Sequence, residues 1–327
     1  MDSRTLGKTG YQISEVGFGA WAVGADWGTV SEADAVAALH AAIDAGVTFV
    51  DTADVYGDGR SERIVAKVRN QRTDVELVVA TKAGRRLSPH VAGGYTIANI
   101  EAFIDRSLAN LDTERLDLLQ LHCPPTDVYY QPELFDGLDG LVAKGIAHYG
   151  VSVEKVEEAI KATEFPGVAT VQIIFNALRL RPAELFFRLA SERNIGIIAR
   201  VPLASGLLSG KMSAASTFAD DDHRQYNRHG DAFDVGETFS GVPYEVGLDA
   251  VAELRSLVPG GVTMAQWALR WILMFDEVSV VIPGAKNPEQ ATSNAEAASL
   301  PPLSTADLAA VRNVYDRLVR PHVHHRW

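Results

Sequence analysis

Short runs of apolar and β-branched residues alternate along the chain with longer stretches whose apolar residues recur at helical spacing. Within 33–45, Val36, Leu39 and Ile43 fall on one face, which predicts an amphipathic helix. The runs expected to form strands are Val16–Gly19, Thr48–Asp51, Leu77–Lys82, Leu116–His122, His148–Ser152, Ala169–Phe175, Ile195–Val201 and Ser279–Pro283. The stretches expected to form helices are Ala33–Ala45, Ser61–Arg69, Ile97–Leu111, Pro132–Lys144, Val153–Thr163, Pro182–Arg193, Thr263–Phe275 and Glu289–Ala298.

Alternation of strands and helices indicates an α/β fold with a parallel sheet. An open, doubly wound sheet is compatible with this pattern, but eight units favour a closed (β/α)8 TIM barrel. Residues 5–6 and 12–14 flank a turn at Gly7–Gly10, so we expect an N-terminal β-hairpin that plugs the bottom of the barrel. An extra C-terminal helix is expected over Thr305–Val319. No low-complexity tract divides the chain, which predicts a single domain over 1–327.

One segment, 212–246, breaks the rhythm of strands and helices. It contains few aliphatic residues, several glycines and the acidic run 220–222. An irregular segment of this length is usually either a functional lid or disordered. Aromatic residues within it could pack against the barrel, which favours a lid loop. They are Phe218, Tyr226, Phe233 and Phe239.

The charge balance restricts the partners that the chain can bind. Its 327 residues carry a formal net charge of −12, which argues against nucleic acid and against an anionic membrane. No apolar run is long enough to span a bilayer, and the N-terminus lacks the pattern of a signal peptide. The single cysteine, Cys123, fits a reducing compartment, so a cytoplasmic location is expected. An anionic cofactor stays compatible with this charge, because a few local cations and backbone N–H groups can bind phosphate.

Polar side chains recur where the predicted strands end. In a barrel of this kind the chemistry lies at the C-terminal ends of the strands. One polar residue there would more often be a salt-bridge partner or a strand cap, whereas several on successive strands favour a functional site. The residues at these positions are Asp51, Lys82, His122, Ser152, Gln172 and Arg200.

The run DTADVYG (51–57) suggests acid–base chemistry at this rim. Tyr56 holds a proton at neutral pH, because a phenol has a pKa of about 10. A neighbouring ammonium stabilises the phenolate and lowers that pKa, and Lys82 could supply it. Asp51 could hold Lys82 charged and in place, and His122 could hydrogen-bond a carbonyl oxygen. Together these groups suit general-acid reduction of a carbonyl.

Over nearly its whole length the sequence resembles the aldo-keto reductase family, and within it a bacterial subgroup that carries the same RVPLASG run. The similar motifs are GFGAW (17–21), DTADVYG (51–57), ATK (80–82), LQLH (119–122), GVS (150–152), VQIIFN (171–176), PLASGLLSGK (202–211) and IPGAKNPEQATSN (282–294). The resemblance implies a catalytic tetrad of Asp51, Tyr56, Lys82 and His122, with Tyr56 as the proton donor. Trp21, Tyr56 and His122 would form the substrate pocket, and the C-terminal segment with Trp327 could border it.

The resemblance also implies NADP(H), or alternatively NAD(H), bound at the barrel rim without a GxGxxG fingerprint. The expected cofactor-binding residues are Ser152, Gln172, Asn176, Arg200, Pro202, Leu203, Ser205, Gly206, Lys211, Gly284, Lys286, Gln290 and Asn294. Three positions depart from the family's usual pattern. Val153 replaces an asparagine, Arg200 replaces an aromatic residue that stacks on the nicotinamide, and Gln290 replaces an arginine that contacts the 2′-phosphate. Lys286 could compensate for the last of these.

The sequence thus predicts an NAD(P)H-dependent enzyme that reduces the aldehyde or ketone of a small molecule to an alcohol. One alternative is a regulatory subunit that senses the cofactor with little turnover, as some relatives of this family do in ion channels. Other barrel chemistries are a metal-dependent hydrolase, for which no residues have the spacing of a metal site, and an aldolase with a Schiff base on Lys82. The physiological substrate and the choice between a monomer and a homo-oligomer stay open.

Overall fold

The computed structural model describes residues 1–24, 30–142 and 144–327. Within these residues, eight parallel strands hydrogen-bond to one another in chain order. They are β3 (Phe18–Gly19), β4 (Phe49–Asp51), β5 (Val78–Ala83), β6 (Leu116–His122), β7 (Ile146–Ser152), β8 (Val168–Ile174), β9 (Gly196–Arg200) and β10 (Val278–Val281). The two outermost strands also meet, because Gly17 N donates to Val281 O at 2.8 Å and Gly19 N to Pro283 O at 3.0 Å. The predicted (β/α)8 fold is therefore confirmed.

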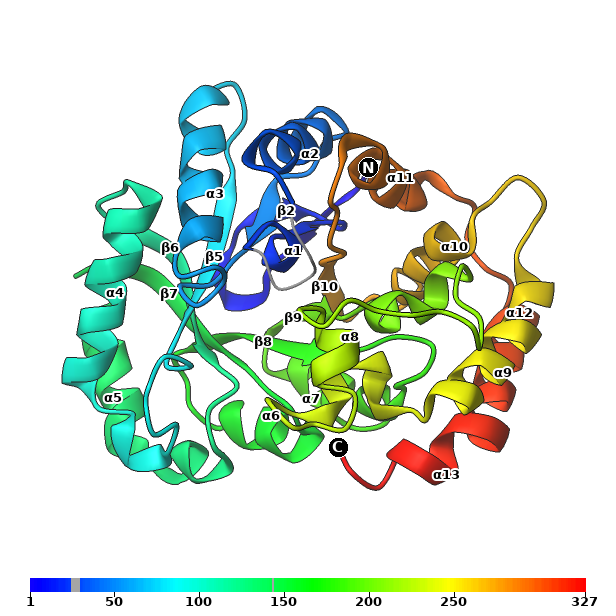
Figure 1. The fold of residues 1–327 in the computed structure, drawn as a ribbon. Coiled ribbons are helices and arrows are strands. Elements are labelled where there is room, and N and C mark those ends of the chain that lie inside the picture. Colours follow the sequence, from blue (N-terminus) through cyan, green and yellow to red (C-terminus); the bar gives the residue numbers. More distant parts are fainter. Residues whose placement is uncertain (25–29, 143) are drawn as a thin grey trace.

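Helices surround the strands on the outside of the molecule (Figure 1). Those that follow the eight strands are α2 (Glu32–Asp44), α3 (Arg60–Gln71), α4 (Ile97–Leu111), α5 (Pro132–Leu141), α6 (Val156–Ala162), α7 (Phe186–Glu192), α10 (Met264–Ile272) and α11 (Pro288–Glu296). Each lies within a few residues of its predicted range. Apolar side chains between the helices and the strands form the main buried core. No helix in the described part of the chain is both long and apolar enough to cross a bilayer.

The expected hairpin consists of β1 (Ser3–Thr5) and β2 (Gln12–Ser14), which pair in antiparallel fashion. Leu6 and Ile13 belong to a second core cluster, with residues from several barrel strands. Gly7 has a φ of +49°, and a Cβ atom there would lie 2.1 Å from Gly196 N. The turn therefore needs a glycine to seat the hairpin against the start of β9.

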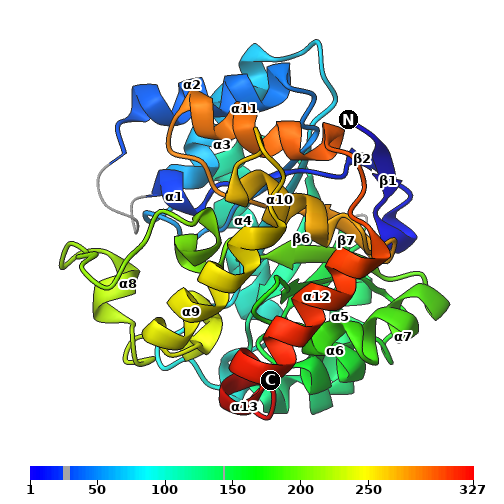
Figure 2. The same cartoon turned by 90° about the vertical axis from the view of Figure 1, so that its right-hand side faces the viewer.

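Elements outside the eight units were predicted less completely. The C-terminal helix is present as α12 (Thr305–Val314), which continues through a π-helical turn at Tyr315–Val319 into α13 (Arg320–Val323). Figure 2 shows α12 beside α9 (Tyr244–Leu254), a helix that the sequence analysis did not predict. The short helix α1 (Trp21–Gly24) was not predicted either. The segment 212–246 is less irregular than expected, because it forms α8 (His223–Tyr226) and two 3₁₀ turns.

Candidate active site

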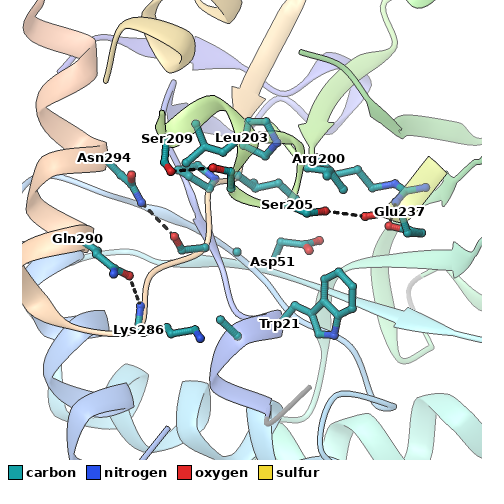
Figure 3. Close-up of a pocket in the computed structure, with 18 of the residues that line it drawn as sticks. Trp21, Asp51, Arg200, Leu203, Ser205, Ser209, Glu237, Lys286, Gln290 and Asn294 are labelled. Atoms are coloured by element: carbon teal, nitrogen blue, oxygen red, sulfur yellow. Dashed lines mark hydrogen bonds and ion pairs between the residues drawn. The ribbon is translucent and has the colours of Figure 1, made fainter. Parts of the chain in front are cut away.

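A cavity of about 810 Å³ opens at the C-terminal ends of the strands. Figure 3 shows Lys286, Gln290 and Asn294 on one side of it, and Trp21, Arg200 and Glu237 on the other. Residues from all eight strands or the loops behind them line its wall, together with the segment 212–246. The location agrees with the rule that barrel sites form at this end of the strands.

The strand register places the predicted polar residues at one level. His122 pairs with Ser152 across β6 and β7, and Ser152 pairs with Gln172 across β7 and β8. On the other side of β6, Lys82 is the last residue but one of β5, and Asp51 is the last residue of β4. Residues far apart in the sequence therefore meet at one edge of the barrel.

Asp51, Lys82 and Tyr56 form a connected group beneath the cavity. Lys82 Nζ lies 2.7 Å from Asp51 Oδ2, donates to Thr52 O at 2.9 Å and lies 3.2 Å from the Tyr56 hydroxyl oxygen. Lys82 is fully buried, so its ion pair with Asp51 is shielded from water. Burial lowers the pKa of Lys82, but Asp51 and Tyr56 more than compensate, and the pKa lies above its ordinary value. This shift favours the charged form of the lysine.

The protonation state of Tyr56 follows from its burial. Burial raises the pKa of its phenol to about 12, and the charge of Lys82 opposes this shift without cancelling it. The effect of Lys82 thus has the predicted sign but is outweighed. At neutral pH the phenol keeps its proton in the cavity and can donate it.

Two amides fix the carboxylate of Asp51 from the interior of the barrel. Gln172 Nε2 donates to Asp51 Oδ1 at 2.7 Å, and Gln120 Nε2 donates to the same oxygen at 3.2 Å. Gln120 was not among the predicted site residues. It precedes His122 by two positions on β6, so the alternation of side chains along a strand could have identified it.

His122 presents a neutral imidazole to the cavity. Burial, followed by the charges of Arg85, Lys82 and Arg200, holds the pKa of His122 well below its ordinary value. Its ring packs edge-on against Tyr56, with the centroids 5.8 Å apart. In the described part of the chain, His122 Nδ1 has no hydrogen-bond partner.

An aromatic wall borders the same end of the cavity. The ring of Trp21 stacks on that of Tyr56 with the centroids 6.1 Å apart, and it contacts the rings of His223 and Phe233. His223 and Phe233 both belong to the segment 212–246, as does Glu237. This segment therefore forms part of the cavity wall near Tyr56.

A buried ionic cluster lies beside the tetrad residues. Arg200 Nη1 lies 2.5 Å from Glu237 Oε2, and Arg200 Nη2 lies 3.0 Å from Glu154 Oε2. The ligand atoms of Cys123, Glu154 and Glu237 lie within 4.8 Å of one another. The guanidinium of Arg200 contacts all three of these residues, since its Nη2 also lies 3.6 Å from Cys123 Sγ. It is therefore the positive charge that faces the two carboxylates.

The opposite end of the cavity is polar and cationic. Lys286 lies at this end, and Lys211 and Arg224 also line the cavity, which provides donors that suit phosphate groups. Gln290 Oε1 accepts from Lys286 N at 2.9 Å, and Asn294 Nδ2 donates to Gly284 O at 3.1 Å, so both amides fix the loop before α11. Cations at one end and the buried tyrosine at the other fit a cofactor with phosphates and a reactive ring.

Nearly all of the predicted cofactor residues line this cavity. They are Ser152, Gln172, Arg200, Pro202, Leu203, Ser205, Gly206, Lys211, Gly284, Lys286, Gln290 and Asn294. Asn176 has a different environment, because its Nδ2 donates to Val201 O at 2.9 Å and to Ser240 Oγ at 2.8 Å, and it is not part of the cavity wall. The amide of Asn176 instead joins β8 to the segment 212–246.

Four charged residues of the cavity wall were missed in the sequence analysis, namely Arg85, Arg224, Glu237 and Glu289. Arg85 lies three positions after Lys82, directly behind β5, and its position after a strand could have identified it. Glu237 has no such signal, because it lies in an irregular segment and meets Arg200 only in the folded chain. Its backbone is held at Ser205, whose Oγ donates to Glu237 O at 2.9 Å.

The comparison with known proteins agrees with this geometry. The sequence model of the Aldo/keto reductase family matches residues 15–316. The chain belongs to this family. YqkF, an oxidoreductase of Bacillus subtilis (strain 168), is 28% identical over 320 residues and 96% of each chain. A probable voltage-gated potassium channel subunit beta of Arabidopsis thaliana is 30% identical over 93% of each chain.

A similar solved structure is that of the glycerol dehydrogenase AKR11B4 from Gluconobacter oxydans. It has a TM-score of 0.78 and 28% sequence identity, and the match covers 97% of this chain and 96% of that one. Family membership confirms the predicted enzyme class, an NAD(P)H-dependent oxidoreductase.

Proposed function

We propose that this aldo-keto reductase reduces an aldehyde or ketone to an alcohol, reversibly, with Tyr56 as the proton donor. The observation that supports this best is the 3.2 Å contact between the Tyr56 hydroxyl and Lys82 Nζ, inside a cavity that also contains His122. A protonated phenol beside a buried ammonium can give its proton to an oxygen that gains negative charge.

Each member of the tetrad has a separate task in this proposal. Tyr56 donates the proton, and Lys82 stabilises the phenolate that is left behind. Asp51 keeps Lys82 charged and in position. The neutral imidazole of His122 donates a hydrogen bond to the carbonyl oxygen and so orients it. A reduced nicotinamide, when bound, supplies the hydride for the carbonyl carbon.

We infer that the cofactor binds along the cavity from Gln172 to Asn294. Ser152 and Gln172 would hold the carboxamide, and 205–211 would wrap the pyrophosphate. Gly284, Lys286, Gln290 and Asn294 would surround the adenosine. We favour NADP(H) over NAD(H), because Lys286 provides a cation where the family's usual arginine is replaced by Gln290.

We also propose that 212–246 acts as a lid over the substrate end. Trp21, Tyr56 and His122 would form the fixed part of the pocket, and Phe233 and Glu237 would belong to the movable part. The aromatic contact between Trp21 and Phe233, with centroids 6.1 Å apart, supports this division.

A cofactor-sensing regulatory subunit is the second candidate, favoured by the 30% identity to the plant channel subunit. One experiment separates the two candidates. The purified chain is titrated with NADPH and NADH by fluorescence, and cofactor oxidation is then followed with a panel of aldehydes and ketones. We expect binding together with turnover of part of the panel. Tight binding without turnover across the panel would favour the regulatory role.

A further inference from the structure

Arg85 brings its guanidinium into the cavity that contains Tyr56 and His122. It follows Gly84, whose φ is +108°, and a Cβ atom on Gly84 would lie 2.5 Å from the ring of Tyr95. A glycine is therefore needed for the chain to turn tightly against Tyr95 after β5. The turn directs the chain to the mouth of the barrel, and the Arg85 side chain is 22% exposed there.

Arg85 and Arg200, two of the guanidinium groups of this cavity, differ in how their donors are used. Arg200 is bound to Glu237 and Glu154, and its Nη2 also donates to Val153 O at 2.9 Å. Arg85 has a distant ion pair, with Glu154 Oε1 at 3.9 Å, and its Cζ lies 5.7 Å from the ring centroid of Phe233. Neither contact is a hydrogen bond. Within the described residues, the N–H groups of Arg85 are thus left for a ligand.

The charges around Arg85 limit what that ligand can be. Arg200 is paired with both Glu154 and Glu237, and Lys82 with Asp51, whereas Arg85 has only the 3.9 Å contact with Glu154 among the described residues. One guanidinium with unused donors suits one carboxylate, which matches its planar fork. A phosphate dianion would bring two charges to this single group. Phe233 covers the guanidinium on the apolar side and strengthens such an ion pair by excluding water.

We propose that Arg85 determines specificity by binding the carboxylate of a short oxo acid, whose carbonyl oxygen lies at Tyr56 and His122. This inference rests on the proposed carbonyl reduction and names its class of substrate. The carboxylate at Arg85 and the carbonyl at Tyr56 would hold the molecule at two points. Arg85 acts on the substrate alone and takes no part in the proton transfer.

The test compares two aldehydes that differ in one charge, with NADPH as the reductant. Succinic semialdehyde carries a carboxylate, and methyl 4-oxobutanoate is its neutral ester. We expect kcat/KM to be at least about 10-fold higher for the acid than for the ester. In Arg85→Gln the value for the acid should fall about 10- to 100-fold, the range that a charge-assisted hydrogen bond supplies, and the value for the ester by less than about 3-fold. Arg85→Lys should lie between the wild type and Arg85→Gln for the acid.

Arg86→Gln is the matched control. Arg86 Nη1 lies 2.7 Å from Asp58 Oδ1 at an exposed position outside the cavity wall, so the same loss of charge should leave both substrates unaffected. Butanoate provides a readout without turnover. It should inhibit competitively with the aldehyde, and its inhibition constant should rise in Arg85→Gln by the same factor as the loss in kcat/KM for the acid.

Two results would overturn the role of Arg85 and leave carbonyl reduction intact. One is an equal effect of Arg85→Gln on the acid and the ester, and the other is a preference for neutral aldehydes over the acid in the wild type. If no aldehyde or ketone is reduced by a chain that binds NADPH, the proposed function itself fails, and the role of Arg85 fails with it.

Discussion

The indole ring of Trp327 lies against the guanidinium of Arg179, whose Cζ is 4.1 Å from the ring centroid. Trp327 Nε1 also donates to Asp234 Oδ1 at 3.1 Å, within the segment 212–246. A Cβ atom on Gly241 would lie 2.1 Å from the indole, so this glycine makes room for the ring. Trp327 is not part of the cavity wall. Its hydrogen bond to Asp234 nevertheless links the C-terminal tail to the segment that contains Phe233 and Glu237.

Replacing Trp327 should therefore loosen the lid without touching the reacting groups. In Trp327→Ala we expect KM for the carbonyl substrate to rise up to about 30-fold, while kcat changes less, because a buried cation–π contact contributes about 2 kcal/mol. Trp327→Phe keeps a ring face for Arg179 and should behave close to wild type. Steady-state kinetics measure both values, and hydrogen exchange of 212–246 should speed up in Trp327→Ala. Unchanged exchange in that variant would show that the tail does not hold the segment.

Lys286 should decide the preference between the two cofactors. In Lys286→Met we expect the Kd for NADPH to rise at least about 10-fold, the value of one charge-assisted contact, and the Kd for NADH to stay nearly constant. Lys211 also lines the cavity, and 205–211 would wrap the pyrophosphate. Lys211→Met should therefore weaken both cofactors alike. Fluorescence titration gives all of these constants, and an equal loss of NADPH and NADH affinity in Lys286→Met would argue against a 2′-phosphate contact.

Asp54 should make stability depend on pH. The residue is fully buried, and within the described residues neither carboxylate oxygen has a hydrogen-bond partner. Burial, and then the nearby charge of Glu62, raise the pKa of Asp54 to about 7. The unfolded chain has a pKa of about 3.9 there, so the folded state binds an extra proton between these values. The contribution of Asp54 to stability is thus highest below about pH 4, falls as the pH rises to about 7, and is constant above that.

Asp54→Asn removes this titration. Relative to the wild type, the variant should gain roughly 2–4 kcal/mol of stability between pH 4 and pH 8, judged from a shift of this size. The quantity to compare is how the stability difference between Asp54→Asn and the wild type changes with pH. Burying the amide of the variant has a desolvation cost of its own, but that cost does not depend on pH. Thermal unfolding of both proteins across this range measures it. A difference that does not vary with pH would show that Asp54 is ionised throughout.

The barrel could be predicted from the sequence because its strands are short apolar runs and its helices carry apolar residues at regular spacing. The helix α9 was missed for a physical reason. Its buried positions include Gly247 and Ala250, which are small residues, and a Cβ atom on Gly247 would lie 2.8 Å from Leu207 Cδ1. Val251 and Leu254 are the only large side chains among its buried positions, and the close packing of the small residues against Leu207 is shown only by the folded chain.

The residues of the candidate site likewise fall into those that the sequence reveals and those that only the folded chain brings together. Asp51 and His122 could be found because each ends an apolar strand, and Gln172 because it is a polar residue near the end of the apolar strand β8, where the register pairs it with Ser152. Glu237 could not, because its partner Arg200 is distant in the sequence and the intervening backbone is irregular. Asn176 was placed near the cofactor by resemblance, whereas its amide joins Val201 and Ser240.

Tyr56→Phe tests the central claim most directly, because it removes one hydroxyl and keeps the ring that stacks on Trp21. Turnover should be compared with the wild type on the same aldehyde, and the Kd for NADPH should be measured by fluorescence titration on the same preparations. We expect kcat to fall about 10²- to 10⁴-fold, the usual contribution of a general acid, while the Kd for NADPH changes by less than about 3-fold. A folded Tyr56→Phe variant that binds NADPH and turns over like the wild type would contradict the account.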